Sequence, residues 1–215
     1  AMGVPGTVSG NTIADINQAA TTSFTTIFTS QGTSDQRPTL AFGASNYSDN
    51  GARPVLADLD RPDSLQRIVG LADIIVHLAP PSAADSSSVT GHHRDTRTRW
   101  LLAALASGRS LPQRIVYIST TGVYGDCAGA LIDETRPPRP ATARACRRLD
   151  AERQLRAFGR RGVVVSILRV PGIYAADRLP LDRLRKGTPA LRAADDVYSN
   201  HIHADDLAMM TCAAL

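Results

Sequence analysis

The sequence is poor in cysteine. Its three cysteines, Cys127, Cys146 and Cys212, are too few and too far apart for a disulfide framework or for a zinc site built on a Cys-x-x-Cys pair. No apolar run in the sequence approaches the roughly 18 residues that a membrane-spanning helix needs. The first residues also lack the basic start and apolar run of a secretory signal. We therefore expect a cytoplasmic protein without a membrane partner.

Lysine is almost missing, and aromatic residues are scarce. Lys186 is the only lysine among 24 basic residues, and the net charge is +4. A positive charge is compatible with nucleic-acid binding, but the arginines are spread among acids without the aromatic interleaving of a single-strand binder. We expect ordinary surface charge and no nucleic-acid partner.

The composition of the chain changes near Gly51. The residues before it are rich in Thr, Ser, Asn and Gln and include one basic residue, Arg37, whereas Arg, Leu, Ala and Val dominate after it. The first part predicts only a short helix over 11–20 and a strand over 23–29. At 215 residues, the chain is long enough to form a core without metals or disulfides.

From Gly51 onward, short apolar runs rich in β-branched residues alternate with amphipathic segments. Strands are predicted at 53–60, 72–81, from Arg114, and at 162–170, and helices at 61–71, 96–108 and 142–158. Continuous apolar strands suit a sheet that is covered on both faces. The pattern predicts an α/β fold with a doubly wound parallel sheet.

Polar or glycine-containing segments follow the predicted strands. In an open parallel sheet, ligands bind beyond the carboxyl ends of the strands, so these junctions are the candidate sites. They are 58–60, 78–81, 119–121 and 170–174. A hydroxyl such as that of Thr120 could donate a hydrogen bond to a substrate oxygen there. Alternatively, the three hydroxyl residues only cap and end the strand.

The segments "ADLDRPDSL", "IIVHLAPP", "VYISTTGVYGD", "ILRVPGIY" and "NHIHADDLA" together resemble a known family. They are similar to the extended short-chain dehydrogenase/reductase superfamily, in particular the NAD-dependent epimerase/dehydratase type, from about Gly51 to the C-terminus. The resemblance implies a Rossmann-like fold, NAD or NADP as cofactor, and a small-molecule substrate, usually a sugar nucleotide. It also implies a homodimer formed through the helices that flank the strand starting at Arg114.

The resemblance also implies roles for individual residues. Thr120 would polarise the substrate. The residues expected near the cofactor are Asp58, Leu59, Leu78, Ala79, Pro80, Ser119, Pro171, Gly172 and Ile173. Those expected near the substrate are Thr121, Tyr174, Asn200 and His201.

One departure from the family concerns proton transfer. About 24 residues after the hydroxyl, the family has a tyrosine, followed four residues later by a lysine, whereas this sequence has Arg144 and Arg148. Arginine stays protonated, so Arg144 cannot shuttle a proton as tyrosine does. The two arginines fall on the predicted sheet-facing stripe of one helix, where like charges need neutralising. Our hypothesis is that both act in the site by binding an anionic group of cofactor or substrate.

The alternative for Arg144 and Arg148 is structural. Their long side chains could reach the edge of the helix and pair with one of the acids Asp126, Asp133 or Glu134.

Two further departures concern the ends of the resemblance. Neither 3–11 nor 42–51 fits the family's strand, Gly-x-x-Gly-x-x-Gly turn and helix, so the first βα unit is expected to be degenerate. The family continues for several tens of residues beyond its match to "NHIHADDLA", so the substrate lobe is expected to be truncated. We therefore expect residues 1–50 to be an atypical N-terminal part of the nucleotide-binding domain. Residues 51–215 would be its Rossmann-like remainder with the start of that lobe.

The sequence leaves more than one function open. His201 and His203 stand two apart near Asp205 and Asp206, but no further cluster has ligand spacing, so no metal site is expected. The leading interpretation is an NAD(P)-dependent epimerase/dehydratase-like protein that acts on a small anionic or sugar-nucleotide substrate. A non-catalytic protein that senses a dinucleotide or an anion is the alternative. A fragment that binds nothing is the third.

Overall fold

The structure is a computed structural model that describes residues 27–30, 38–41, 55, 57–82, 93–176, 179, 181–189, 192 and 196–215. The predicted helix over 11–20 and the glycine-containing segment at 3–11 lie outside these residues. The predicted strand over 23–29 is confirmed at Ile27–Thr29, and its remaining residues lie outside the described ones.

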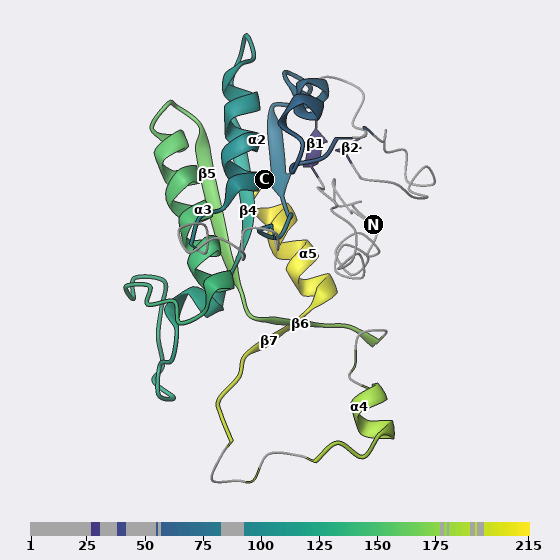
Figure 1. Ribbon diagram of the computed structural model, residues 1–215, viewed down its shortest axis with the longest axis vertical. Helices are drawn as coiled ribbons and strands as arrows, with labels where there is room; N and C mark the ends of the chain where they lie inside the picture. Colours follow the sequence, from purple (N-terminus) through teal and green to yellow (C-terminus); the bar gives the residue numbers. More distant parts are fainter. Residues whose placement is uncertain are drawn as a thin grey trace, which may run out of the picture.

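A five-stranded sheet forms the centre of the fold, in the order β2-β1-β3-β4-β5 (Figure 1). Strands β3 (Ile74–His77), β4 (Arg114–Thr120) and β5 (Val164–Val170) run parallel, as predicted. Strand β1 (Ile27–Ser30) pairs antiparallel with both β3 and β2 (Pro38–Ala41). The predicted α/β, Rossmann-like fold is confirmed, and its N-terminal strands depart from the repeated βα pattern.

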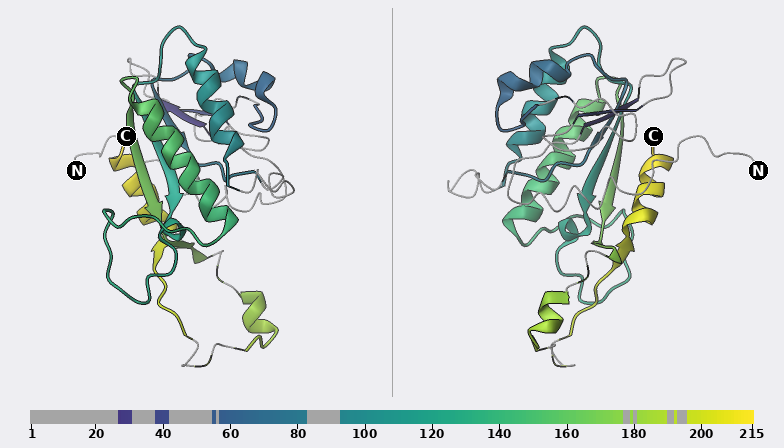
Figure 2. Two further views of the ribbon diagram at one scale, coloured as in Figure 1. Left: turned by 60° about the vertical axis from the view of Figure 1, so that its left-hand side comes forward. Right: turned by 90° about the vertical axis from the view of Figure 1, so that its right-hand side faces the viewer.

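Helices cover both faces of this sheet. Helices α2 (Thr96–Ala106) and α3 (Ala143–Gly159) lie on one face, and α5 (Ala204–Ala213) lies on the other (Figure 2). Helix α2 is capped by Asp95, whose side chain accepts hydrogen bonds from the backbone N–H groups of Arg97 and Thr98. The Thr142 side chain caps α3 in the same way. Such caps fix where a helix begins, and both helices begin close to the end of the preceding strand.

The larger hydrophobic core lies between the sheet and the helices α2 and α3. Leu101 of α2, Leu155 of α3 and Ile115 of β4 are fully buried there. On the opposite face, Val76 and Val116 are buried against the end of the chain at Ala214 and Leu215. Burial of apolar side chains on both faces explains why the parallel strands read as continuous apolar runs.

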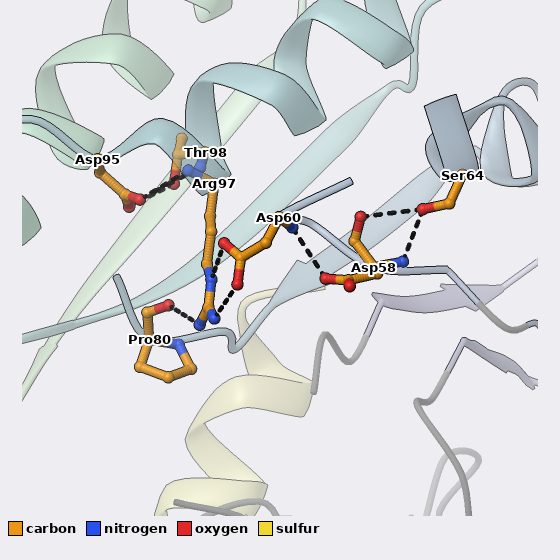
Figure 3. Close-up of polar contacts among 7 residues, drawn as sticks. All are labelled: Asp58, Asp60, Ser64, Pro80, Asp95, Arg97 and Thr98. Atoms are coloured by element: carbon orange, nitrogen blue, oxygen red, sulfur yellow. Dashed lines mark hydrogen bonds and ion pairs between the residues drawn. The ribbon is translucent and has the colours of Figure 1, made fainter. Parts of the chain in front are cut away.

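The strand predicted at 53–60 is not formed in the part of this segment that the structure describes. Asp58 instead begins a turn that leads into the 3-10 helix η2 (Pro62–Ile68), in place of the helix predicted over 61–71. The backbone N–H of Asp58 donates to Ser64 Oγ (2.8 Å), and its carboxylate accepts from the backbone N–H of Asp60 (2.9 Å; Figure 3). These local bonds occupy polar groups that a strand would need for its neighbours.

After β5, the chain leaves the main sheet and forms a small parallel pair. Strand β6 (Gly172–Tyr174) pairs with β7 (His201–His203), and the short helix α4 (Leu181–Arg185) lies in the connection between them (Figure 1). Residues 170–174, predicted as a strand-to-loop junction, therefore continue into a second strand. Within the described part of the chain, no helix combines the length and apolar character needed to cross a bilayer.

Candidate functional site at the carboxyl edge of the sheet

A pocket of about 480 Å³ opens where β4 ends and α3 begins. It is lined by Thr120, Thr121, Gly122, Thr142, Arg144, Ala145, Pro171, Gly172 and Ile173. Three segments that the sequence analysis selected separately, at the end of β4, the start of α3 and the exit of β5, thus line one pocket. This position agrees with the rule that ligands bind beyond the carboxyl ends of parallel strands.

Thr120 brings a hydrogen-bond donor to this pocket. It is the last residue of β4, and its Oγ1 accepts a hydrogen bond from the backbone N–H of Gly122 at 3.2 Å. A hydroxyl has one hydrogen and two acceptor positions, so this bond leaves the hydrogen available. Thr142 is in the same situation, because its Oγ1 accepts from the N–H of Ala145 at 3.2 Å. The pocket can therefore donate hydrogen bonds from two hydroxyls.

Arg144 gives the pocket its charge. It is exposed in the first turn of α3, and no acidic side chain is among the residues that line the pocket. Among the described residues, no ion pair joins Arg144 to Asp126, Asp133 or Glu134. An arginine beside hydroxyl donors, without a carboxylate, is suited to an anionic ligand.

Arg148 has a different environment, although the sequence placed it on the same helical stripe. It is buried, and its Nη1 donates to the carbonyl oxygens of Ala79 (3.2 Å) and Ile118 (3.0 Å) and to the hydroxyl of Tyr117 (3.0 Å). It thereby joins the ends of β3 and β4. Within the described residues, the structure records no acceptor for its Nε or Nη2. The two arginines separate because Arg144 lies in the first turn of α3 and Arg148 one turn deeper.

A buried polar cluster surrounds Arg148. The Nε2 of His77 lies 2.9 Å from Thr98 Oγ1, and the Thr98 hydroxyl donates to Asp95 at 2.8 Å. Because the Thr98 hydrogen is used in that bond, His77 Nε2 must be the donor. Burial lowers the pKa of His77 to about 3, and the charges of Arg148 and Arg97 act in the same direction. Burial raises the pKa of Asp95, while Thr98 and Arg148 oppose that shift.

Tyr117 is not suited to proton transfer near neutral pH. It is fully buried in β4, and burial raises its pKa to about 12. With His77 also held neutral, neither group exchanges a proton in the range where most enzymes work.

The neutral His77 makes stability depend on pH. Its pKa is about 3 in the folded chain and near 6.5 when unfolded, so between these values only the unfolded chain takes up the proton. We expect the free energy of unfolding to fall by about 2 kcal/mol more between pH 7 and pH 5 in the wild type than in His77→Gln. Urea unfolding at both pH values measures this. The raised pKa of Asp95 increases stability as the pH falls, but this contribution is present in both the wild type and His77→Gln. If the free energy of unfolding depended equally on pH in the wild type and in His77→Gln, the assignment of His77 as a buried neutral group would be contradicted.

A third arginine, Arg97, was not selected from the sequence, and it organises the predicted cofactor edge. Arg97 of α2 is buried and forms a two-point ion pair with Asp60, with Nε 2.8 Å from Oδ1 and Nη2 2.6 Å from Oδ2 (Figure 3). Its Nη1 donates to the carbonyl oxygen of Pro80 at 3.0 Å. Arg97 thus ties the turn at 58–60 to the loop at 78–81. Nothing local in the sequence reveals this, because Asp60 lies 37 residues away.

The side chains along this edge are mostly directed into the protein. Leu59 and Ala79 are buried in the main core, and Leu78 packs on the opposite face of the sheet. Pro80 is exposed. A ligand at this edge would therefore meet the backbone of Leu59 and Ala79 rather than their side chains.

Ser119 is held inside the protein. Its hydroxyl donates to Glu152 Oε1 at 2.6 Å, so its hydrogen is not available to a ligand. Glu152 is paired in turn with Arg169 of β5. Sequence analysis missed both charged residues. The available signals were an acid beside the apolar positions of α3 and an arginine within the apolar run at 162–170.

The predicted substrate residues of β6 and β7 lie beside the pocket. The backbone N–H of Gly172 donates to the carbonyl oxygen of Asn200 at 3.1 Å. The His201 ring is so close that a Cβ on Gly172 would come within 2.6 Å of its Cδ2. Tyr174 contacts the ring of His203 edge-on, with centroids 5.2 Å apart. The His201 ring is thus placed against a pocket residue.

This arrangement defines a class of protein. The parallel strands β3, β4 and β5, covered by helices on both faces and with a pocket at their carboxyl ends, form a Rossmann-like nucleotide-binding fold. Residues 19–215 match the model of the NAD dependent epimerase/dehydratase family. The chain belongs to that family.

Solved and curated relatives agree with this assignment. A Methylobacillus flagellatus protein assigned as an NAD-dependent epimerase/dehydratase is 31% identical, with a TM-score of 0.57 over 78% of this chain and 55% of that one. A double mutant of DesIV, a dTDP-glucose 4,6-dehydratase from Streptomyces venezuelae with NAD and DAU bound, is 25% identical, with a TM-score of 0.62 over 79% of this chain and 58% of that one.

A curated relative from Stigmatella aurantiaca is 4-hydroxy-2-methyl-3-oxo-4-farnesyl-3,4-dihydroquinoline-1-oxide ketoreductase. It is 28% identical over 131 residues, which are 59% of this chain and 39% of the relative. The chain thus matches little more than half the length of the two solved relatives and less of the curated one.

Proposed function

We propose that the chain is the nucleotide-binding part of an NAD(P)-dependent epimerase/dehydratase-like oxidoreductase that acts on a small anionic substrate, such as a sugar nucleotide. The observation that carries this proposal is the pocket that combines Thr120 with Arg144 and residues 171–173. The dTDP-glucose dehydratase and the ketoreductase among the relatives support the reaction class.

The residues at the carboxyl edge fit a dinucleotide. Arg148 is anchored through Nη1 and keeps two nitrogens for which the described residues supply no acceptor. Those donors suit phosphate or ribose oxygens. Asp58, the loop at 78–80 and residues 171–173 would border the same molecule. When bound, NAD or NADP would supply the hydride acceptor or donor.

Within the pocket, each residue has a separate task. The Thr120 hydroxyl donates a hydrogen bond to the substrate oxygen whose charge changes during reaction. Arg144 pairs with the anionic group of the substrate and orients it. The residues lining the pocket include no histidine, carboxylate, cysteine, tyrosine or lysine. Proton transfer would therefore go to solvent or to a group outside this lining, rather than to Arg144.

The composition of α3 favours a second candidate function. Helix α3 contains neither a tyrosine nor a lysine, so the family's usual proton shuttle is missing from it. A protein that binds a dinucleotide or an anion without turning it over would need only the pocket and the arginines. Binding of ligand without any turnover would support this alternative.

Replacement of Arg144 by alanine tests the proposed substrate class. We expect the affinity for UDP-glucuronic acid to fall by about 10- to 100-fold, because a charge-assisted hydrogen bond contributes roughly 1.5–3 kcal/mol. Isothermal titration calorimetry measures the change. Arg153→Ala is a matched control, because Arg153 is exposed on the same helix and does not line the pocket. An affinity in Arg144→Ala equal to that of the control would overturn the role of Arg144.

A further inference from the structure

A buried ion pair contacts Ser119, the residue before Thr120. Glu152 of α3 has 1% of its side chain exposed, and Arg169 of β5 has 13%. The Arg169 Nη2 is 2.8 Å from Glu152 Oε2, and its Nε is 3.2 Å from both carboxylate oxygens. The pair thus connects a helix to a strand through several hydrogen bonds in a site that is largely closed to water.

This pair is also bound to the segment that carries Thr120, on both sides of it. On one side, Glu152 accepts the hydrogen of Ser119, the residue immediately before Thr120, at 2.6 Å. On the other side, Arg169 Nη1 donates to the hydroxyl of Tyr124 at 2.9 Å. Tyr124 ends the short 3-10 helix η4 (Thr121–Tyr124), which follows Thr120 directly.

A third contact links the Arg169 guanidinium to the loop that contains Glu134. Arg169 Nη1 lies 3.3 Å from the carbonyl oxygen of Glu134, and the guanidinium carbon lies 4.8 Å from the centre of the Tyr124 ring. Lysine could not reproduce this set of contacts, because it has a single ammonium group in place of a planar fork.

We propose that Glu152 and Arg169 are positioning residues that hold the segment 119–124 at both ends and so keep the Thr120 hydroxyl in the pocket. The inference rests on the proposed function, because it assumes that the hydroxyl binds substrate. A buried ion pair need not stabilise a fold, since well-packed apolar residues of similar size are often equally stable. The links to Ser119 and Tyr124 give this pair a role that apolar residues could not fill.

The double variant Glu152→Met/Arg169→Met separates positioning from stability. Each single variant leaves a buried charge without its main partner and should lower the melting temperature strongly, whereas the double variant removes both charges and should recover most of it. In the double variant, we expect amide hydrogen exchange in 119–124 to become at least 10-fold faster. Exchange in the buried strand residues 115–117 should stay slow. The affinity of the double variant for UDP-glucuronic acid should also fall.

Two further variants keep the test decisive if the double variant does not fold. Ser119→Ala and Tyr124→Phe each remove one link and leave the ion pair intact, so each should accelerate exchange in 119–124. Arg156→Met is the control, because Arg156 is mostly exposed and its Nη2 lies 3.8 Å from Glu152. It should leave exchange unchanged.

The outcomes distinguish this inference from the proposed function. Native exchange in 119–124 in every folded variant would overturn the positioning role. Accelerated exchange together with weaker binding would support both. If the wild type itself does not bind UDP-glucuronic acid, the proposed function fails on that measurement, and accelerated exchange would still support the hold on the segment.

Discussion

Replacing Thr120 by valine is expected to lower turnover by about 10²- to 10³-fold, the loss typical of removing one preorganised donor to a developing negative charge. Valine has nearly the same shape as threonine and suits the end of a strand, so the fold should persist. The change removes the hydroxyl hydrogen that the bond from Gly122 leaves available. Steady-state kinetics with dTDP-glucose and UDP-glucuronic acid, in the presence of NAD or NADP, would measure it.

Thr120→Ser is the control for this experiment, because it retains the hydroxyl and should keep most of the activity. If the wild type binds ligand without turnover, the same pair of variants can be compared by affinity, with an expected loss of about 10-fold for valine alone. If the turnover and the ligand affinity of Thr120→Val both stayed within threefold of the wild type, Thr120 would have no role in the site.

Replacing Gly125 by alanine should cost more than about 3 kcal/mol of stability or prevent folding, for two separate reasons. Gly125 has φ 71° and ψ −154°, a backbone region that is essentially restricted to glycine. A Cβ at this position would also overlap the backbone carbonyl oxygen of Arg139, which cannot move as a flexible side chain could. Urea unfolding measures the change in free energy.

Gly162→Ala tests a positive φ without any close contact. Gly162 has φ 93°, and a Cβ there would meet no atom within 4 Å. We expect it to cost only about 1–2 kcal/mol. Equal losses in Gly125→Ala and Gly162→Ala would show that the contact with Arg139 does not matter. A larger loss in Gly125→Ala would show that this turn, which follows η4 and the pocket, is fixed by close backbone contact.

Helices and strands with strong local signals were predictable from the sequence. The helices expected at 96–108 and 142–158 are found at Thr96–Ala106 and Ala143–Gly159, because their caps and apolar periodicity are local features. The strand expected at 53–60 failed in its described part for an equally local reason, the hydrogen bonds between Asp58, Asp60 and Ser64. The antiparallel direction of β1 was not predictable, because strand pairing depends on distant residues.

The residues of the candidate site were likewise only partly predictable from the sequence. The rule that ligands bind beyond the carboxyl ends of parallel strands was sufficient to select Thr120, Thr121 and residues 171–173, whereas Arg144 was selected by its match to the family's tyrosine position; the structure brings all of them together in one pocket. It could not select Arg97 or Arg169, whose partners Asp60 and Glu152 lie 37 and 17 residues away. Helical periodicity also placed Arg144 and Arg148 on one face of α3. The structure separates them, because Arg144 lies exposed in the first turn of α3 and Arg148 lies buried one turn deeper.

Calorimetric titration of the wild-type chain with NAD and with NADP, followed by UDP-glucuronic acid, shows whether the pocket binds an anionic substrate beside a dinucleotide. We expect saturable binding of at least one dinucleotide. We also expect UDP-glucuronic acid to bind after the dinucleotide, with an affinity that both Arg144→Ala and Thr120→Val reduce. The absence of saturable binding for both dinucleotides and for UDP-glucuronic acid would contradict the proposed function.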